Sequence, residues 1–381
     1  MQNKKILFDG RFLSLSHAGI GRYSCEILKN ILLLDKKQKF IVPLIRGTEI
    51  DQDLSDALTL REEPVDIIEV DEKHYSLGEQ TRYLKLLNEL KPDLVHFPHF
   101  NHPVFYRGNF VVTIHDLTLS QFAERRGVLK RWVYSKVITH AAQKSQAIFT
   151  VSQFAKSDLA RGFGLPKSKI NVTYNGIDKR FKKITNPSAL KKIEKYSLNK
   201  PYILSVGQWR SHKNLPRLVE AFGELQKDKK YKDKIDLVFA GRIDPKFPDL
   251  PKKVRELNLE KSVKFIGFVP DDELPIIYNM AEIFVFPSLS EGFGLPGLEA
   301  QACFTPVAAS RRSSLPEILG EGALYFEPGK PLEISKKIAT VLEDKKVSQE
   351  LILKGLENTK RFSWEDSAKK TFEVYREILY K

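Results

Sequence analysis

The sequence predicts an α/β protein with two parallel-sheet domains in tandem, and three observations support this prediction. The chain has 381 residues, which is too long for one ordinary hydrophobic core and long enough for two. Short apolar runs alternate with longer amphipathic segments along the chain, as expected for a parallel sheet that helices cover on both faces. The alternation pauses once near the middle of the chain and then starts again, so we expect two such sheets.

The first series of elements occupies residues 1–178. Its predicted strands are short runs rich in Ile, Leu, Val and Phe. They are residues 4–9, 40–44, 65–70, 93–96, 110–114 and 147–151. Apolar residues recur at helical spacing in residues 20–34, 77–90 and 128–142, which we predict to be helices.

The second series follows a lysine-rich stretch with prolines, residues 179–201, which has weak periodicity and which we interpret as a connection between domains. Its predicted strands are residues 202–207, 235–240, 263–266, 283–287, 306–308 and 323–326. Residues 364–379 carry an apolar face at helical spacing. We therefore predict an N-terminal domain at residues 1–178, a C-terminal domain at residues 179–362, and a final helix in residues 363–381 that packs back on the first domain.

The composition and the net charge limit the classes of partner and of site that we expect for this protein. Lys and Arg number 62 against 48 Asp and Glu, and the resulting net charge of +14 favours acidic partners such as nucleic acid, anionic lipid or a phosphate-bearing substrate. The two cysteines, Cys25 and Cys303, exclude a disulfide framework and a cysteine-based zinc site. The start of the sequence holds no apolar run of signal-peptide length, and the longest aliphatic run, residues 31–34, is far shorter than the roughly 20 residues of a membrane-spanning helix. We therefore expect a cytoplasmic protein without a spanning helix.

The most informative stretch is residues 286–300, where a predicted strand runs into a glycine-rich turn and a helix begins near Pro296. The first backbone amides of such a helix, together with its dipole, make an anion site suited to a diphosphate. We expect Gly292, Gly294 and Gly297 to let the backbone approach a ligand closely.

Two glutamates, Glu291 and Glu299, bracket this turn with seven residues between them. We expect Glu299 in the first turn of the helix, where a carboxylate would repel phosphate but could accept hydrogen bonds from a neutral polyol such as ribose. An ordinary glycine loop with a glutamate favoured by the helix dipole is the alternative interpretation.

Four histidines lie around the predicted strand ends of the first domain: His96, His99, His102 and His115. Prolines interrupt this segment and the spacing is not that of a helical zinc motif, so we expect no metal there. His115 follows the predicted strand at residues 110–114 directly and can hydrogen-bond a hydroxyl group or help to move a proton. A capping or surface histidine is the alternative.

Two further motifs are disfavoured as cofactor or metal sites. Gly19 and Gly21 nearly match the G-x-G-x-x-G pattern of dinucleotide-binding proteins, but nine residues separate them from the predicted strand, whereas the pattern requires a glycine directly after it. Asp51 and Asp53 have the spacing of a metal-binding carboxylate pair, but they lie in a polar run that we interpret as a solvated acidic loop.

A basic helix is predicted at residues 124–144. Its charged residues are Glu124, Arg125, Arg126, Lys130, Arg131, Lys136 and Lys144. Apolar residues that include Trp132 interleave with them at helical spacing, as in helices that lie on anionic membranes. A helix packed on the domain with a solvated basic face is the alternative.

Residues 286–300 resemble the C-terminal signature of the retaining nucleotide-sugar glycosyltransferases of family 4, in which seven residues separate two glutamates within a GT-B fold. Further segments resemble motifs of this family in the right order and over essentially the whole chain. Residues 19–23 resemble its N-terminal glycine loop, residues 113–117 its acceptor-side histidine, residues 150–154 and 174–178 the run into its hinge, and residues 206–214 the opening of its nucleotide domain. The resemblance implies two Rossmann-like domains that face a central cleft.

The resemblance also implies roles for residues around the two glutamates. Glu299 would hold the ribose hydroxyls of the donor nucleotide, and Glu291 would lie beside the donor sugar as a catalytic residue. The backbone around Phe293, Gly294 and Leu295 would surround the sugar and the phosphates.

Lys213 would neutralise the diphosphate, which is the leaving group. Family members often carry arginine at the positions of Gln208 or His212, and we expect Arg210 to replace that missing charge.

Two residues of the N-terminal domain receive roles in the same way. Gly21 would let its loop approach the donor diphosphate. His115 would be the second catalytic residue, on the acceptor side.

The resemblance implies a retaining glycosyltransferase that moves a hexose from a nucleotide-diphosphate sugar to a saccharide or lipid-linked acceptor, in the synthesis of cell-surface polysaccharide or glycolipid. Overall resemblance favours mannose and GDP, while the base, the sugar and the acceptor stay open. We expect no metal, no cofactor besides the donor substrate, no nucleic-acid partner, and peripheral contact with the inner face of the membrane. Two alternatives stay open: a sugar-nucleotide epimerase of the same fold, and a basic protein that binds nucleic acid.

Overall fold

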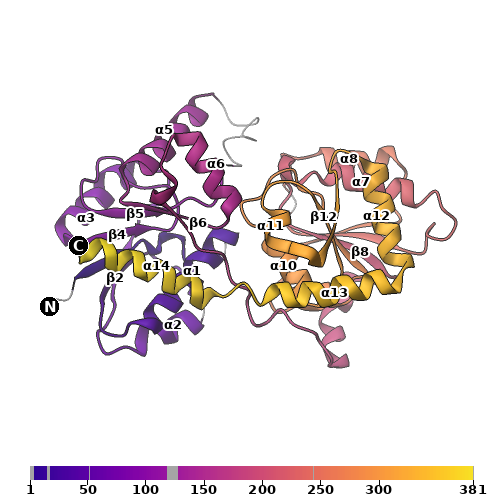
Figure 1. Cartoon of the computed structure of the whole chain (residues 1–381), viewed down its shortest axis with the longest axis horizontal. Helices are drawn as coiled ribbons and strands as arrows, with labels where there is room; N and C mark the ends of the chain where they lie inside the picture. Colours follow the sequence, from indigo (N-terminus) through magenta and orange to yellow (C-terminus); the bar gives the residue numbers. More distant parts are fainter. Residues whose placement is uncertain (1–3, 15–17, 51, 118–127, 243, 381) are drawn as a thin grey trace. The chain divides into compact units, whose positions relative to one another are not determined.

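The computed structural model describes residues 4–14, 18–50, 52–117, 128–242 and 244–380 (Figure 1). The chain divides into two compact units. Unit 1 comprises Met1–Gly176 together with Ser363–Lys381, and unit 2 comprises Ile177–Phe362. Each unit contains its own parallel sheet.

Unit 1 contains a seven-stranded sheet in the order β3-β2-β1-β4-β5-β6-β7, and all its neighbouring strands are parallel. The strands are β1 Lys5–Phe8, β2 Lys39–Ile45, β3 Asp66–Val70, β4 Leu94–Phe97, β5 Phe110–Thr113, β6 Ala147–Thr150 and β7 Ile170–Val172. Every residue of β4, β5 and β6 is buried, which agrees with their unbroken apolar sequences.

The longer helices of unit 1 are α1 Ala18–Leu34, α2 Gln52–Thr59, α3 Leu84–Leu90, α5 Val128–Lys144, α6 Gln153–Phe163 and α14 Trp364–Leu379. Shorter helical turns are η1 Gly10–Phe12, η3 Glu79–Tyr83 and η4 Lys167–Lys169. Ser152 begins α6 as its N-cap, because its Oγ accepts the N–H of Ala155 at 3.0 Å.

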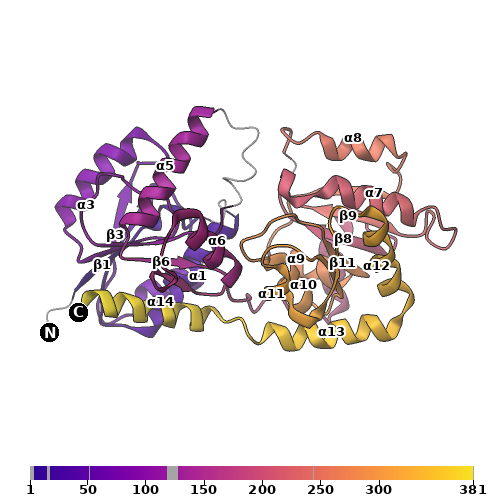
Figure 2. The same cartoon turned by 45° about the horizontal axis from the view of Figure 1, so that its top comes forward.

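The last helix, α14, packs against α1 within unit 1 (Figure 2). Ser363 caps its start by accepting the N–H of Asp366 at 3.2 Å. Further along, the hydroxyl of Tyr375 hydrogen-bonds the Nδ1 of His96 in β4. The start of α14 lies very close to the backbone at Gly176. A Cβ at this position would lie 2.2 Å from the backbone nitrogen of Trp364, so a residue with a side chain would clash there and glycine fits.

The described side chains of helix α5, from Trp132 onward, pack on unit 1 through one face. Ile138 is buried, and Tyr134 and Val137 pack against the same core. In contrast, 59% of Trp132 and 47% of Val133 are exposed. The helix is therefore a packed element that also presents an apolar surface. Glu124, Arg125 and Arg126, and the side chains of Lys130 and Arg131, lie outside the described part of the chain.

Unit 2 contains a six-stranded parallel sheet in the order β10-β9-β8-β11-β12-β13. The strands are β8 Tyr202–Val206, β9 Asp236–Ala240, β10 Val263–Gly267, β11 Ile283–Phe286, β12 Val307–Ser310 and β13 Ala323–Phe326. The helices are η5 Pro187–Tyr196, η6 Ser211–Lys213, α7 Leu215–Leu225, α8 Asp249–Glu256, α9 Leu274–Asn279, α10 Leu295–Ala302, α11 Leu315–Leu319, η7 Gly320–Gly322, α12 Pro331–Glu343 and α13 Lys345–Thr359.

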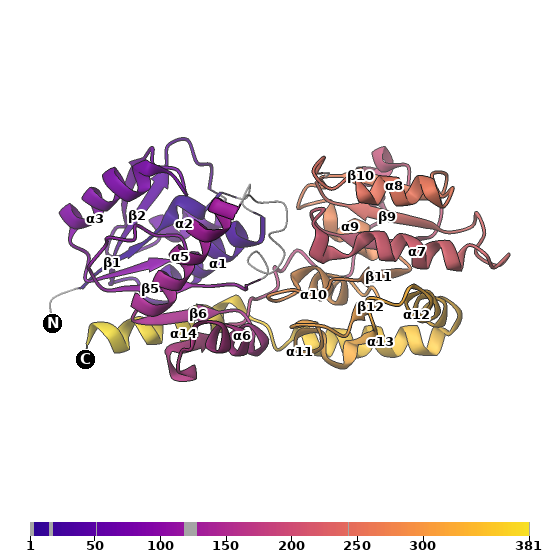
Figure 3. The same cartoon turned by 90° about the horizontal axis from the view of Figure 1, so that it is seen from above.

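The sheet of unit 2 lies between α7 and α8 on one side and α10 and α13 on the other (Figure 2). Helices α7 and α8 lie side by side, as a view from above shows (Figure 3). Leu218 and Phe222 of α7 and Ile334 and Ile338 of α12 belong to one buried cluster with strand residues such as Leu237. The amphipathic spacing in these helices therefore builds the core of unit 2.

Three details differ from the sequence-based expectations. Residues 179–201 were expected to connect the domains, but they contain η5 and pack on unit 2, where Nζ of Lys195 lies 2.7 Å from Oε1 of Glu273. Asp53 was expected in a loop, but it lies in the first turn of α2, where a carboxylate interacts favourably with the helix dipole. Strand β7 was not predicted, because its three residues include the polar Asn171 and form no apolar run. Asp51 lies outside the described residues.

No helix in the described part of the chain is long and apolar enough to cross a membrane.

Candidate active site

The loop after β8 is fixed to the end of β11 at the carboxyl edge of the unit 2 sheet. Asn214 ends η6 in the left-handed region, with φ +56°. Its side-chain amide donates to the carbonyl oxygens of Pro287 at 3.0 Å and Pro328 at 2.8 Å. The residues just before Asn214 are thereby held next to the glycine-rich turn that follows β11.

This arrangement brings together two of the predicted residues, Lys213 and Glu291. The Nζ of Lys213 lies 2.7 Å from Oε1 of Glu291, and the side chains are only 17% and 12% exposed. The same Nζ lies 5.6 Å from the ring centroid of Phe286 at the end of β11. A cation and a carboxylate therefore meet where open α/β sheets bind their ligands.

The backbone at Glu291 is fixed from the loop that follows β12. Its N–H donates to Oγ of Ser313 at 3.0 Å. The hydroxyl of Ser314 donates to the carbonyl oxygen of Glu291 at 2.9 Å and to that of Phe293 at 2.8 Å. The turn that carries the carboxylate is therefore held rigidly before any ligand binds.

The side chain of Arg210 pairs with Asp244 and not with Glu291, the partner of Lys213. Its guanidinium forms an ion pair with Asp244 and lies 5.5 Å from the ring centroid of Phe247. The structure therefore does not place Arg210 in the contact between Lys213 and Glu291. Its predicted role at the diphosphate stays a prediction.

His212 is one of the two positions at which the resemblance led us to expect arginine. Burial lowers the pKa of His212 to about 4, although the nearby charge of Glu291 acts in the opposite direction. The imidazole is therefore uncharged near neutral pH and adds no positive charge beside Lys213.

Glu299 is buried, with 4% of its surface exposed. Its Oε2 accepts a hydrogen bond from the hydroxyl of Tyr278 in α9 at 3.0 Å. The prediction that Glu299 lies in the first turn of its helix is wrong, because α10 begins at Leu295 and places Glu299 in the second turn. Burial and the charge of Glu299 together raise the pKa of the neighbouring Cys303 thiol.

Two glycines of the motif, Gly294 and Gly297, have packing roles. A Cβ at Gly297 would lie 2.7 Å from Cδ2 of Leu319 in α11, and one at Gly294 would lie 2.8 Å from Cδ2 of Leu315. Gly294 also caps α10 with φ +117°, a conformation that favours glycine. Helix packing therefore already accounts for a glycine at position 297, and its predicted role in the approach of a ligand stays a prediction.

The other two predicted donor residues lie at the start of α10. Phe293 is buried, and its ring packs edge-on against that of Phe362 with centroids 5.6 Å apart. Leu295 is half-buried as the first residue of the helix. Contact between the donor and the backbone at these two residues stays a prediction.

In unit 1, Gly21 lies in α1 and is buried. The prediction that it belongs to a loop is wrong, because α1 already begins at Ala18 and the hydroxyl of Ser24 donates to the carbonyl of Ile20 inside the helix, at 2.8 Å. Its predicted approach to the donor diphosphate stays a prediction.

His115 follows β5 and is fixed by the carbonyl oxygen of Pro98, which is 3.1 Å from its Nε2. Burial lowers the pKa of His115 to about 4, although this hydrogen bond acts in the opposite direction. Since a carbonyl can only accept, the proton of the neutral ring is on Nε2 and Nδ1 can accept a hydrogen bond. The ring of Tyr23 packs edge-on against it at 4.7 Å.

Two of the remaining predicted histidines are structural. Nε2 of His96 lies 2.8 Å from Oγ1 of Thr113, its Nδ1 bonds Tyr375, and burial lowers its pKa to about 3. Nε2 of His102 lies 2.9 Å from Nδ1 of His140. Among the described residues, no group of three or more His, Cys, Asp or Glu side chains is arranged to hold a metal ion.

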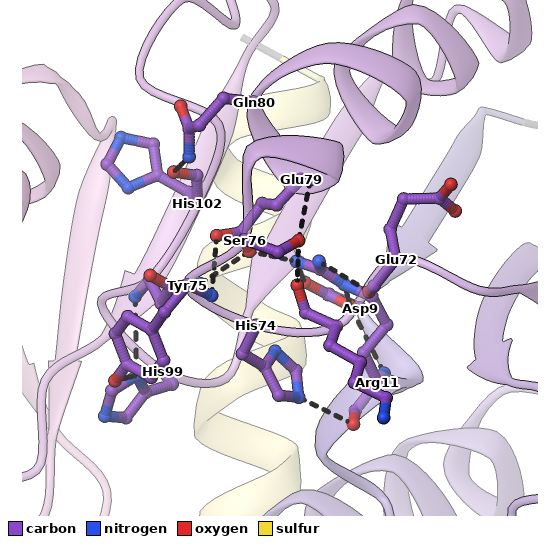
Figure 4. Close-up of polar contacts among 12 residues, drawn as sticks. Asp9, Arg11, Glu72, His74, Tyr75, Ser76, Glu79, Gln80, His99 and His102 are labelled. Atoms are coloured by element: carbon purple, nitrogen blue, oxygen red, sulfur yellow. Dashed lines mark hydrogen bonds and ion pairs between the residues drawn. The ribbon is translucent and has the colours of Figure 1, made fainter.

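Sequence reasoning missed a buried ionic cluster beyond β1 (Figure 4). Nη2 of Arg11 lies 2.7 Å from Oδ2 of Asp9 and 2.8 Å from Oε1 of Glu79, and all three side chains are at most 1% exposed. The guanidinium also lies 3.7 Å from the ring centroid of Tyr83. One signal was present in the sequence, because an Asp and an Arg two residues apart directly follow an apolar strand.

Burial and the charge of Arg11 have opposite effects on the pKa values of the two carboxyl groups in this cluster. Burial alone would raise the pKa of Asp9, but the charge of Arg11 and its hydrogen bonds lower it. At Glu79 the effect of burial outweighs that of Arg11, and the pKa is raised.

Comparison with known proteins identifies the family. A family model described as Glycosyltransferase Family 4 matches residues 52–181, and one described as Glycosyl transferases group 1 matches residues 188–357. The chain belongs to glycosyltransferase family 4. The predicted family is therefore confirmed.

One of the reported relatives and one solved structure match this glycosyltransferase over nearly its whole length. It is 29% identical to the O-antigen chain mannosyltransferase B of Escherichia coli over 98% of this chain and 99% of that protein. It is 30% identical to the serotype-specific mannosyltransferase WbdA of Escherichia coli over 62% of this chain, which corresponds to 29% of that longer protein. The structure of Anabaena HepE in complex with UDP and glucose matches 98% of this chain and 100% of that chain, with a TM-score of 0.74 and 20% identity. The predicted fold class, two parallel-sheet α/β domains of the GT-B type, is confirmed.

Proposed function

We propose that this glycosyltransferase is a retaining mannosyltransferase that uses GDP-mannose and a saccharide or lipid-linked acceptor, in the synthesis of cell-surface polysaccharide or glycolipid. The names of two similar proteins support mannose as the sugar. Within the site, the observation that carries the proposal is the contact between Lys213 and Glu291 at the carboxyl edge of the unit 2 sheet.

In the proposed reaction, the bond between the anomeric carbon and the diphosphate breaks, and the diphosphate leaves with the electron pair. The acceptor oxygen attacks the same face, and the leaving phosphate oxygen takes the acceptor proton, so the protein supplies orientation more than a strong base. Lys213 and the first amides of α10, aligned with its dipole, would stabilise the departing charge. We propose that these groups suffice without a metal ion.

Glu291 is proposed to stabilise the positive charge that develops on the sugar ring. Its carboxylate is fixed by Lys213, and its backbone is fixed by the loop after β12. The alternative role is that of a covalent nucleophile, as in retaining glycosidases. We favour the electrostatic role, because an ammonium group 2.7 Å away competes for the carboxylate lone pairs that a nucleophile must use.

His115 is proposed to act on the acceptor side. Its pKa of about 4 leaves the ring uncharged, and its bond to Pro98 leaves Nδ1 as the acceptor nitrogen. That nitrogen can receive a hydrogen bond from an acceptor hydroxyl.

We further propose that α5 contacts an anionic membrane. Trp132 and Val133 are exposed, and Nζ of Lys136 lies 5.6 Å from the ring centroid of Trp132. Tryptophan beside lysine is typical of helices that bind a charged lipid surface.

A flotation assay with vesicles tests this contact. We expect binding to anionic vesicles that salt weakens, since charges are screened within about 8–10 Å at physiological ionic strength. We also expect Trp132→Ala to bind these vesicles more weakly. Equal binding to neutral vesicles, or binding to neither, would contradict this role.

A thermal-shift panel of GDP-, UDP- and ADP-sugars tests the proposed donor. A ligand at 100 times its Kd stabilises the folded state by about 2.7 kcal/mol, which raises the Tm of a domain this size by several degrees. We expect the largest shift with GDP-mannose. A larger shift in Tm with a UDP- or ADP-sugar would assign a different donor to the enzyme. No shift with any of these sugars would contradict the proposed function.

A further inference from the structure

The carboxyl ends of β1 and β4 in unit 1 lie at the point where the order of strands reverses. Strand β1 pairs with β2 on one side and with β4 on the other, and the chain forms β2 and β3 before it returns to β4. In open α/β sheets, ligands bind outside the strand ends at such a switch point. A ligand of unit 1 is therefore expected beside the residues that follow β1 and β4.

A row of four aromatic side chains lies at this edge, and we call it the aromatic row. Its members in spatial order are Tyr75, His99, His115 and Tyr23. The successive ring centroids are 6.3, 6.5 and 4.7 Å apart. His99 and Tyr23 are buried, whereas 61% of Tyr75 is exposed. The row therefore ends in a large aromatic side chain that is open to solvent.

The backbone holds Tyr75 in a conformation that bulky residues rarely adopt, with φ +57°. Its N–H donates to Oε2 of Glu79 at 3.1 Å, and the other carboxylate oxygen of Glu79 accepts from Arg11 at 2.8 Å (Figure 4). Strain of this kind persists where the surrounding structure enforces it, and it gathers at ligand-binding sites. The buried pair of Arg11 and Glu79 thus fixes the position of an exposed aromatic ring.

The polar groups of the aromatic row suit an uncharged ligand with hydroxyl groups. Nδ1 of His99 accepts the N–H of Asn101 at 3.4 Å, so this nitrogen already has a partner within the protein. In His115, Nε2 faces the carbonyl oxygen of Pro98, and Nδ1 can accept a hydrogen bond from a hydroxyl group. The carboxylates of Asp9 and Glu79 in the adjoining cluster would repel a phosphate.

We propose that Tyr75 is the surface on which a sugar ring of the acceptor stacks, while Nδ1 of His115 bonds a hydroxyl group elsewhere on the same acceptor. This inference rests on the proposed function, which supplies a saccharide acceptor. The face of an aromatic ring carries partial negative charge and attracts the slightly positive C–H groups of a sugar. An apolar face combined with a few fixed polar groups is the usual composition of a small-molecule site. Tyr75 is thus a binding residue that orients the acceptor.

Three variants of the full chain test this inference. Tyr75→Asn removes the ring and suits the left-handed backbone, because asparagine tolerates positive φ. Tyr75→Phe keeps the ring and removes only the hydroxyl, which lies 3.5 Å from Nδ1 of His99. Phe105→Ala is the matched control, since Phe105 is another aromatic residue of unit 1 and is 65% exposed.

The probe is methyl α-mannobioside, and its binding is followed by saturation-transfer NMR, with GDP affinity measured in parallel by calorimetry. We expect similar saturation transfer for the wild type, Tyr75→Phe and Phe105→Ala, loss of most of it for Tyr75→Asn, and unchanged GDP affinity in all four proteins. In a transferase assay, Tyr75→Asn should raise the acceptor KM about tenfold without changing the donor KM.

The outcomes separate this inference from the proposed function. Equal saturation transfer in Tyr75→Asn and the wild type, or none in the wild type, would overturn the inference, and GDP binding would still support a nucleotide-sugar enzyme. A lower GDP affinity in Tyr75→Asn would assign the ring to the nucleotide and would also overturn the inference. Absence of GDP binding in the wild type would instead count against the proposed donor.

Discussion

Replacing Lys213 by alanine removes the ammonium group that lies 2.7 Å from Glu291 in a site where both side chains are largely buried. One hydrogen bond to a charged group contributes about 1.5–3 kcal/mol, which corresponds to a loss of about 10- to 150-fold in affinity for GDP. The substitution also leaves the carboxylate of Glu291 near the proposed diphosphate site without its cation. We therefore expect a loss in the upper part of that range.

Isothermal titration calorimetry with GDP measures this effect directly. The matched control is Lys192→Ala, because Nζ of Lys192 forms an ion pair with Asp272 at 2.9 Å in which both side chains are more than half exposed. Exposed pairs of this kind contribute at most about 1 kcal/mol, so we expect wild-type GDP affinity for the control. Wild-type GDP affinity in Lys213→Ala would refute the assignment of Lys213 to the diphosphate.

Three further predictions concern the other residues of the two units. Glu291→Gln should mainly lower kcat if the carboxylate stabilises developing charge as proposed, whereas Glu299→Gln should mainly raise the donor KM. The reverse pattern in steady-state kinetics would exchange their roles. Arg210→Ala should weaken GDP binding less than the lysine variant does, since Asp244 already pairs with the guanidinium, and an equal loss in calorimetry would place Arg210 at the diphosphate. Folding lowers the pKa of His96 to about 3 and that of His115 to about 4. The unfolded state therefore binds more protons than the folded state below pH 6.5. We expect each histidine to lower the free energy of unfolding by about 2 kcal/mol between pH 6.5 and pH 5. An unchanged urea midpoint over that range would contradict this last expectation.

The sequence alone predicted those strands and turns that depend on residues close together along the chain. The apolar strands that end at Phe8, Val206 and Phe286 were predicted within one or two residues of their observed ends, because a buried parallel strand is a short, unbroken apolar run. The turn from β11 into α10 was also predictable, since glycines and Pro296 mark the start of a helix. The order of the motifs along the chain then identified the family.

The remaining features depend on contacts between residues distant in the sequence. Nothing near Glu299 indicates that the hydroxyl of Tyr278 will bond it in a buried position. The packing role of Gly297 depends on Leu319 in another helix. Likewise, Arg11 follows β1 and Glu79 lies after β3, so these two residues meet only in the folded sheet. Such partners are set by tertiary packing, which composition and periodicity do not encode.

The configuration of the product tests the central claim most directly. The purified enzyme is incubated with GDP-α-mannose and methyl α-mannobioside, and the new glycosidic linkage is assigned by NMR from its anomeric one-bond coupling. A retaining transferase with its donor site around Lys213 and Glu291 forms an α-linked trisaccharide, and Glu291→Gln forms it more slowly. A β-linked product, an epimerised nucleotide sugar, or an unchanged rate in Glu291→Gln would contradict the account.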